Sequence, residues 1–126
     1  MTRYDDLRFA PPAPVAYVTL RKLDGSSSVE GVPMLLDTGA DVSLLPRSGV
    51  ERLGVRAASD EGVTLVGFDG SRTVSASVEV ALLLSGRTFR GRFLLLDQDW
   101  GILGRNILNH LPLQLDGPRL SWQIVR

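Results

Sequence analysis

The sequence predicts an all-β domain, a barrel of short strands with one or two short helices. Short runs rich in Val, Leu and Thr make up most of the chain. Turn signals separate these runs about every ten residues, a spacing typical of all-β barrels and sandwiches. The chain has 126 residues, of which 44% are hydrophobic, and no cysteine. This length is typical of one domain, and the apolar content is enough to build a core without disulfide bonds.

The first half of the chain is expected to contain an arm, a hairpin, a further strand and a helix. Residues 1–14 end in a proline-rich segment and are interpreted as an extended arm, ahead of a domain over residues 15–126. Two strands and their connecting loop form the hairpin: Val15–Leu23, Asp24–Ser28 and Val29–Leu36. The strand Val42–Leu45 follows, and Pro46 then begins a short helix near Arg47–Leu53, which Gly54 ends.

The second half is expected to contain three further hairpins. Their paired strands are Val63–Val66 with Thr73–Val80, Val78–Leu84 with Arg87–Leu96, and Leu113–Leu115 with Leu120–Val125. Between the second and third hairpins we expect a loop over Asp97–Trp100, a short strand at Ile102–Leu103 and a small helix from Asn106 to His110.

Composition excludes several classes of function. The chain has 14 basic and 14 acidic residues, so its net charge gives no general attraction to nucleic acid or membranes. The absence of cysteine excludes thiolate nucleophiles and cysteine-type zinc sites, and the single histidine, His110, excludes a multi-histidine metal site. Neither a membrane-spanning apolar run nor a signal-peptide core is present, so a cytoplasmic protein is expected.

The most informative segment is Asp37-Thr38-Gly39, which lies between the apolar runs Val32–Leu36 and Val42–Leu45. A buried strand thus delivers a carboxylate into a tight turn. Two carboxylates about 3 Å apart cannot both ionise, so one serves as an acid and the other as a base, as in the well-known aspartic-protease pair. The alternative is a turn aspartate that only caps its own backbone.

Leu35–Asp41 resembles the active-site motif of retropepsins, the retroviral-type aspartic proteases. The segment Gly101–Leu108 is similar to their Gly-Arg-Asn segment near the C-terminus, and the resemblance covers roughly residues 15–125. It implies a retropepsin-like closed barrel, a single lobe that dimerises, and hydrolysis without a cofactor or metal. Because the chain carries one Asp-Thr-Gly and is too short for two lobes, a homodimer would bring Asp37 to Asp37 of the partner subunit.

The resemblance also implies roles for individual residues. Asp37, Thr38 and Gly39 are the expected catalytic residues, with Thr38 holding the two active-site loops together across the dimer. Asp41 and Arg105 would form a structural ion pair, although two unrelated surface charges are the alternative. The hairpin tip Gly67–Ser71 is the candidate flap over bound peptide; it is less glycine-rich than the retroviral flap, and an ordinary surface hairpin is the alternative.

A set of mostly apolar residues is expected to contact the substrate. These residues are Leu35, Ala40, Asp41, Val42, Leu44, Gly67, Phe68, Asp69, Gly70, Trp100 and Ile102. They imply an extended peptide or protein substrate with hydrophobic side chains near the cut, bound by strand addition. The alternative for each apolar member is a place in the core.

The chain end differs from the retroviral pattern, because Leu113–Val125 predicts two strands where retroviral enzymes have one. In this respect it looks more like the cellular and bacterial retropepsin-like domains. The leading functional hypothesis is an aspartic endopeptidase. The alternatives are a dimeric peptide-binding or scaffold module that kept the fold without turnover, and a domain that processes only its own chain, with residues 1–14 as a linker or self-cleavage site.

Overall fold

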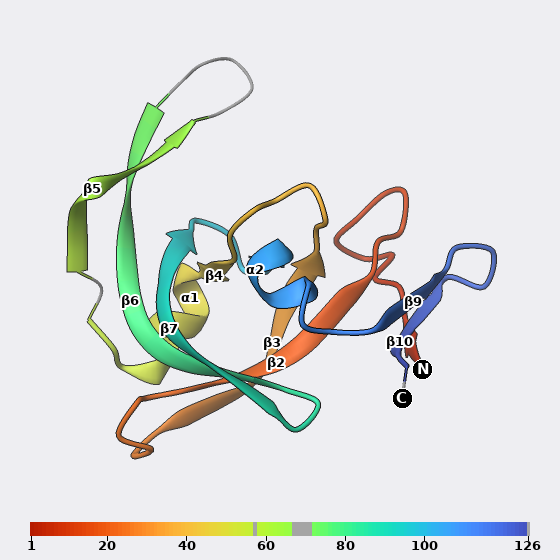
Figure 1. Cartoon of the computed structure of the whole chain (residues 1–126), viewed down its shortest axis with the longest axis horizontal. Coiled ribbons are helices and arrows are strands. Elements are labelled where there is room, and N and C mark those ends of the chain that lie inside the picture. The colour runs from red at the N-terminus through yellow and green to blue at the C-terminus, as the bar shows by residue number, and fades with distance from the viewer. Residues whose placement is uncertain (57, 67–71, 126) are drawn as a thin grey trace.

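A closed ring of six strands dominates the computed structural model, which describes residues 1–56, 58–66 and 72–125 (Figure 1). The strands follow one another in the order β2-β3-β8-β4-β7-β6, and a pairing between β2 and β6 closes the ring. Their bounds are β2 Val15–Arg21, β3 Ser28–Leu36, β4 Leu44–Pro46, β6 Arg72–Leu84, β7 Arg87–Leu96 and β8 Gly101–Leu103. With the helices α1 (Arg47–Leu53) and α2 (Arg105–Leu108), this confirms the predicted barrel with short helices.

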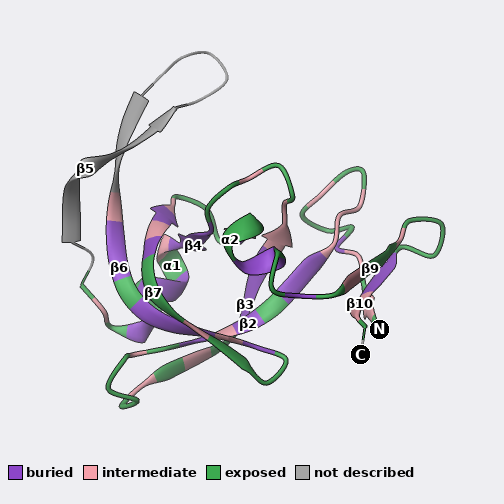
Figure 2. Cartoon of the chain, in the orientation of Figure 1, coloured by how far each residue is buried: buried purple, intermediate pink, exposed green. Residues whose placement is uncertain are grey.

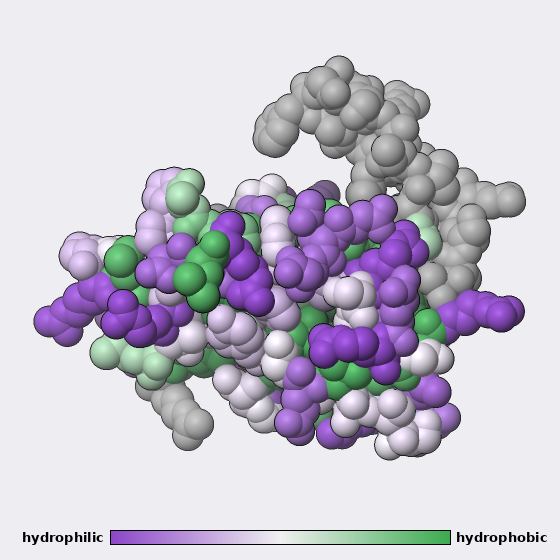
Figure 3. All heavy atoms as spheres, turned by 180° about the vertical axis from the view of Figure 1, so that it is seen from behind, coloured by the Kyte–Doolittle hydropathy of each residue, from purple (hydrophilic) through white to green (hydrophobic). Residues whose placement is uncertain are grey.

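Alternating side chains of the ring strands fill the core. Several of these core side chains have no exposed surface, among them Leu20, Val32, Met34, Leu45, Val80, Leu82 and Leu103. Buried residues lie mostly along the ring strands and α1, while the connecting loops are mostly exposed (Figure 2). On the reverse face of the molecule, apolar side chains reach the surface in small areas between polar ones (Figure 3).

Helix α1 has the bounds that the sequence predicts. Pro46, which has no N–H to leave unpaired, occupies the N-cap position, and the helix ends at Gly54 in the left-handed conformation with φ of +82°. The Gly54 N–H donates to the carbonyl oxygens of Val50 and Glu51. Val50 and Leu53 belong to the buried core cluster, so α1 closes one side of the barrel.

Strand β6 differs from the prediction, because one strand of 13 residues replaces two predicted strands that overlapped. Neither glycine nor proline interrupts the sequence between Thr73 and Leu84, so the backbone stays extended. One edge of β6 pairs first with β5 (Ala58–Val66) and later with β2, while its other edge pairs with β7. The strand therefore passes from an outer hairpin into the ring.

The two ends of the chain meet in a second, three-stranded sheet. Its order is β1-β10-β9, with β1 at Thr2–Arg3, β9 at Leu113–Asp116 and β10 at Ser121–Ile124. The indole N–H of Trp122 donates to the Val15 carbonyl oxygen at 3.2 Å and ties this sheet to β2. The final hairpin predicted from the sequence is therefore present. None of the helices in the described ranges is long and apolar enough to cross a membrane.

Candidate active site

The two motifs meet because β3 and β8 are parallel neighbours. Leu36 pairs with Leu103, so the chain leaves both strands at the same end of the sheet. The Asp37 N–H donates to the Leu103 carbonyl oxygen at 3.0 Å, and the Arg105 N–H donates to the Ala40 carbonyl oxygen at 2.8 Å. The Asp-Thr-Gly turn is therefore clamped on both sides by the segment that follows β8.

Within this turn the Asp37 carboxylate is half-buried and held in one orientation. Its Oδ1 atom accepts a hydrogen bond from the Gly39 N–H at 3.0 Å. A Cβ atom at Gly39 would lie 3.2 Å from the same oxygen, so glycine keeps the carboxylate uncrowded. No described residue hydrogen-bonds to Oδ2. The turn-capping bond considered as an alternative is thus formed, but it occupies only one oxygen and leaves the second for another group.

The ion pair predicted between Asp41 and Arg105 is absent from the described part of the chain. The Arg105 guanidinium instead donates to the Thr38 carbonyl oxygen at 2.7 Å, while Asp41 is exposed. The backbone contact between Arg105 and Ala40 brings the arginine against this turn, and the Thr38 carbonyl is the acceptor within reach. Arg105 therefore contacts the Asp37 turn through a backbone oxygen of Thr38.

Ser43, a residue that sequence reasoning missed, also ties the segments together. The Ser43 hydroxyl accepts from the Gly104 N–H at 2.9 Å and donates to Asn106 Oδ1 at 2.7 Å. Ser43 is 2% exposed and lies just before β4, which begins at Leu44 rather than at Val42 as predicted. A small polar residue inside an otherwise apolar run was the available signal, because a buried hydroxyl needs hydrogen-bond partners.

Three of the predicted substrate-contacting residues form one row across the sheet. Leu35 pairs with Ile102, which pairs in turn with Leu44. Directly paired residues project to the same side of a sheet, and their sequence neighbours Met34, Leu45 and Leu103 fill the core on the other side. The row therefore lies on the outer face of these strands, with Leu44 more buried than its two neighbours.

The remaining predicted contacts are distributed over loops. Ala40, Asp41 and Val42 belong to the segment that follows the Asp37 turn, and Val42 is 37% exposed. Trp100 is half-buried just before β8 and contacts Phe9 of the N-terminal arm. The candidate flap, with Gly67, Phe68, Asp69 and Gly70, lies outside the described residues.

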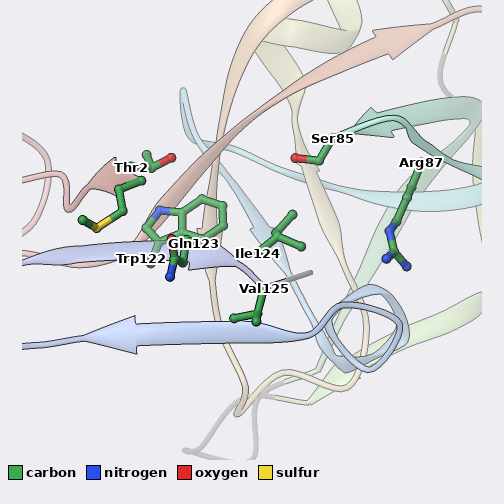
Figure 4. Close-up of a pocket in the computed structure, with 8 residues that line it drawn as sticks. Thr2, Ser85, Arg87, Trp122, Gln123, Ile124 and Val125 are labelled. Carbon is green, nitrogen blue, oxygen red and sulfur yellow. The ribbon is translucent and has the colours of Figure 1, made fainter.

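A groove lies at the terminal sheet. It has a volume of about 560 Å³ and runs between β10 and the turn that joins β6 to β7 (Figure 4). Trp122, Ile124, Val125 and Arg87 contribute to its walls. None of the predicted site residues lines it.

A parallel strand pair that delivers an Asp-Thr-Gly turn on a closed single-lobe barrel defines a retropepsin-like aspartic protease. The aspartyl protease family model matches residues 21–107, and the chain belongs to this family. It is 36% identical over 91 residues to the Pol polyprotein of equine infectious anemia virus, strain Wyoming. That match covers 72% of this chain and 8% of the polyprotein, so the chain spans a small part of this relative.

The chain is also similar to solved structures. The EIAV protease in complex with an inhibitor matches with a TM-score of 0.60 and 29% identity, over 84% of this chain and 91% of that one. A retropepsin-like aspartic protease from Rickettsia conorii matches with a TM-score of 0.51 and 19% identity, over 82% of this chain and 87% of that one, and shows the fold alone.

Proposed function

We propose that this chain is an aspartic endopeptidase that works as a homodimer, with Asp37 of each subunit at the centre. The observation that carries the proposal is the Asp37 carboxylate, of which one oxygen is anchored by Gly39 and the other has no hydrogen-bond partner among the described residues. A water between the two carboxylates is activated by the ionised one, while the protonated one donates to the oxygen of the scissile carbonyl. The reaction forms no covalent intermediate with the protein.

The second carboxylate has to come from another subunit, because the chain holds one Asp-Thr-Gly. Thr38 and Gly39 are exposed in the single chain, which leaves the turn accessible to a symmetry-related copy. The terminal sheet is the proposed contact surface. Leu115, Leu120 and Val125 are 49%, 38% and 41% exposed there, a level of apolar exposure that suits an interface.

The proposed substrate is an extended peptide with apolar side chains near the cut. The outward row of Leu35, Ile102 and Leu44 lies across the strands that carry the two motifs and offers an apolar floor. Val42, which is 37% exposed, adds apolar surface next to the Asp37 turn. Side chains of an extended peptide alternate in direction, so pockets on this apolar surface would bind every second side chain.

The test is incubation of the purified chain with a diverse peptide library, beside an Asp37→Asn variant. We expect the wild type to cleave at apolar positions and the variant to lose cleavage by at least about a thousandfold, because the acid–base pair is removed. Asp24→Asn is the matched control, since it makes the same change at an exposed hairpin tip. Binding of peptides without cleavage by the wild type would instead favour a scaffold module.

A further inference from the structure

The N-terminal arm is folded into a closed loop, Asp5–Ala13, which we call the clasp. Asp5 and Ala13 exchange two backbone hydrogen bonds, of 2.8 and 3.1 Å. Inside the clasp the Asp5 carboxylate accepts from the N–H groups of Leu7 and Arg8, both at 2.9 Å, and from the Arg8 guanidinium at 2.6 Å. The Asp5 side chain is 3% exposed. A buried, fully engaged carboxylate therefore gives the clasp a defined shape.

The clasp reaches the loop that precedes β8. The Phe9 ring stands edge-on to the Trp100 ring, with 5.0 Å between their centroids and 68° between their planes. The hydrogen bond to Asp5 raises the pKa of Arg8, and the charge of Asp99, the neighbour of Trp100, adds to this shift. The contact between the clasp and this loop is therefore made by Phe9 and Trp100.

The loop that precedes β8 also contacts α1 at its other end, through Asp97. Asp97 forms an ion pair with Arg47 of α1, with 2.5 Å between Oδ1 and Nε. Trp100 lies two residues before Ile102, the middle member of the outward apolar row. An edge-on aromatic contact stabilises a pair of rings beyond the burial of their area, so the Phe9 ring favours one position of the indole.

We propose that the clasp is a specificity element of the peptidase, in which Phe9 fixes Trp100 as one wall of a substrate pocket beside Ile102. This inference rests on the proposed function above. Two aromatic rings on one side of the pocket leave little room for a third. The wild type should therefore prefer aliphatic over aromatic side chains next to the cut.

The experiment compares cleavage of matched peptides that carry Leu or Phe next to the cut. Phe9→Ala removes the ring and frees Trp100, so we expect the ratio of kcat/KM for the Phe peptide to that for the Leu peptide to rise by about tenfold or more. Leu7→Ala is the control within the clasp: its side chain is 93% exposed, and its ratio should stay at the wild-type value. Phe9→Leu, which keeps an apolar side chain without the ring, decides the question if Phe9→Ala does not fold.

Acrylamide quenching of tryptophan fluorescence supplies a readout that does not depend on activity. The other tryptophan, Trp122, is 5% exposed, so added quenching in Phe9→Ala reports on Trp100. Increased quenching in Phe9→Ala with an unchanged cleavage ratio would overturn the specificity role of the clasp. A cleavage ratio that shifts equally in Leu7→Ala would overturn it as well. A wild type without any cleavage overturns the proposed function and this inference with it, whereas an active wild type with an unmoved ratio overturns this inference alone.

Discussion

Glycines at the start of β8 and just after its end show how closely the segments around the Asp37 turn are packed. A Cβ atom at Gly101 would lie 2.4 Å from the Leu44 carbonyl oxygen, and one at Gly104 would lie 2.3 Å from that of Val42. Real Cβ atoms do not approach backbone oxygens so closely, so any side chain would push β8 away from its neighbours. Because β8 is paired with the strand that delivers Asp37, such a shift would reach the carboxylate.

Gly104→Ala should therefore lower both stability and activity. Overpacking of this kind typically costs about 1–3 kcal/mol, and here the obstacle is backbone, which yields less easily than a side chain. Thermal unfolding and cleavage rate of the same variant measure the two effects. Gly117→Ala is the matched control, since nothing lies within 4 Å of a Cβ atom at that position. Equal melting temperatures for the two variants would contradict the packing argument.

Ser43→Ala tests the hydrogen bonds that join β4 to the segment after β8. The substitution leaves the buried Gly104 N–H without its acceptor and Asn106 without its donor, at a cost of about 1–3 kcal/mol. Ser48→Ala, at an exposed position of α1, should leave the unfolding free energy nearly unchanged. Chemical denaturation of both variants gives the comparison. A Ser43→Ala protein as stable as the wild type would mean that water replaces the hydroxyl.

At this scale the sequence reveals local chemistry but not long-range partners. Asp37 could be proposed as a site residue because its neighbours form a motif, and Ser43 could have been suspected because it is a polar residue in an apolar run. The contact of Phe9 with Trp100 could not be predicted, since it joins residues far apart in sequence. Arg105 was placed next to the correct loop, but which oxygen it binds depends on the backbone path of the turn.

Single elements were predicted well where their ends carry local signals. Pro46 and Gly54 bound α1 as expected, because a missing N–H and a left-handed residue act within one turn of helix. Strand β6 was divided incorrectly, because alternation alone does not tell where a strand changes partners. The arm was interpreted as extended from its prolines, whereas the Asp5 carboxylate folds it into the clasp.

The clasp should make part of the stability depend on pH. Hydrogen bonds from Arg8, first of all from its backbone N–H, hold the pKa of Asp5 below its ordinary value of 3.8. A carboxyl with a lowered pKa in the folded state stabilises the fold above its unfolded pKa, and this contribution disappears as the pH falls through the folded pKa. Asp5→Asn should thus be less stable than the wild type near neutral pH, and the difference should shrink in acid.

Urea unfolding at several pH values measures this difference. Asp6→Asn provides the control, because it removes the same charge from an exposed neighbour and should follow the wild type over the whole range. If the difference in unfolding free energy between Asp5→Asn and the wild type stayed constant down to strongly acidic pH, Asp5 would stabilise the clasp by its shape and not by its ionisation.

For the whole molecule, the sequence predicted a closed barrel but not the order of its strands. The pairings of β3 with β8, β4 with β7 and β2 with β6 join segments that are distant in sequence, two of them in parallel. No turn signal encodes such contacts, since only the burial of a common core selects them. The terminal sheet likewise joins both ends of the chain, and its exposed apolar residues are the basis for the proposed dimer.

Mixing two kinds of subunit tests that dimer directly. If catalysis needs Asp37 from both subunits, an excess of the Asp37→Asn chain should capture wild-type subunits in mixed dimers that hold one carboxylate. A ninefold excess should then lower wild-type activity roughly tenfold once subunits have exchanged, since random pairing leaves few wild-type pairs.

The control is the double variant Asp37→Asn with Leu115→Lys, in which a charge replaces an exposed apolar residue of the terminal sheet. If this sheet is the interface, the double variant should sediment as a monomer and leave the wild type fully active. Undiminished activity in the presence of the folded single variant would show that one chain suffices for catalysis, and the homodimer mechanism would be wrong.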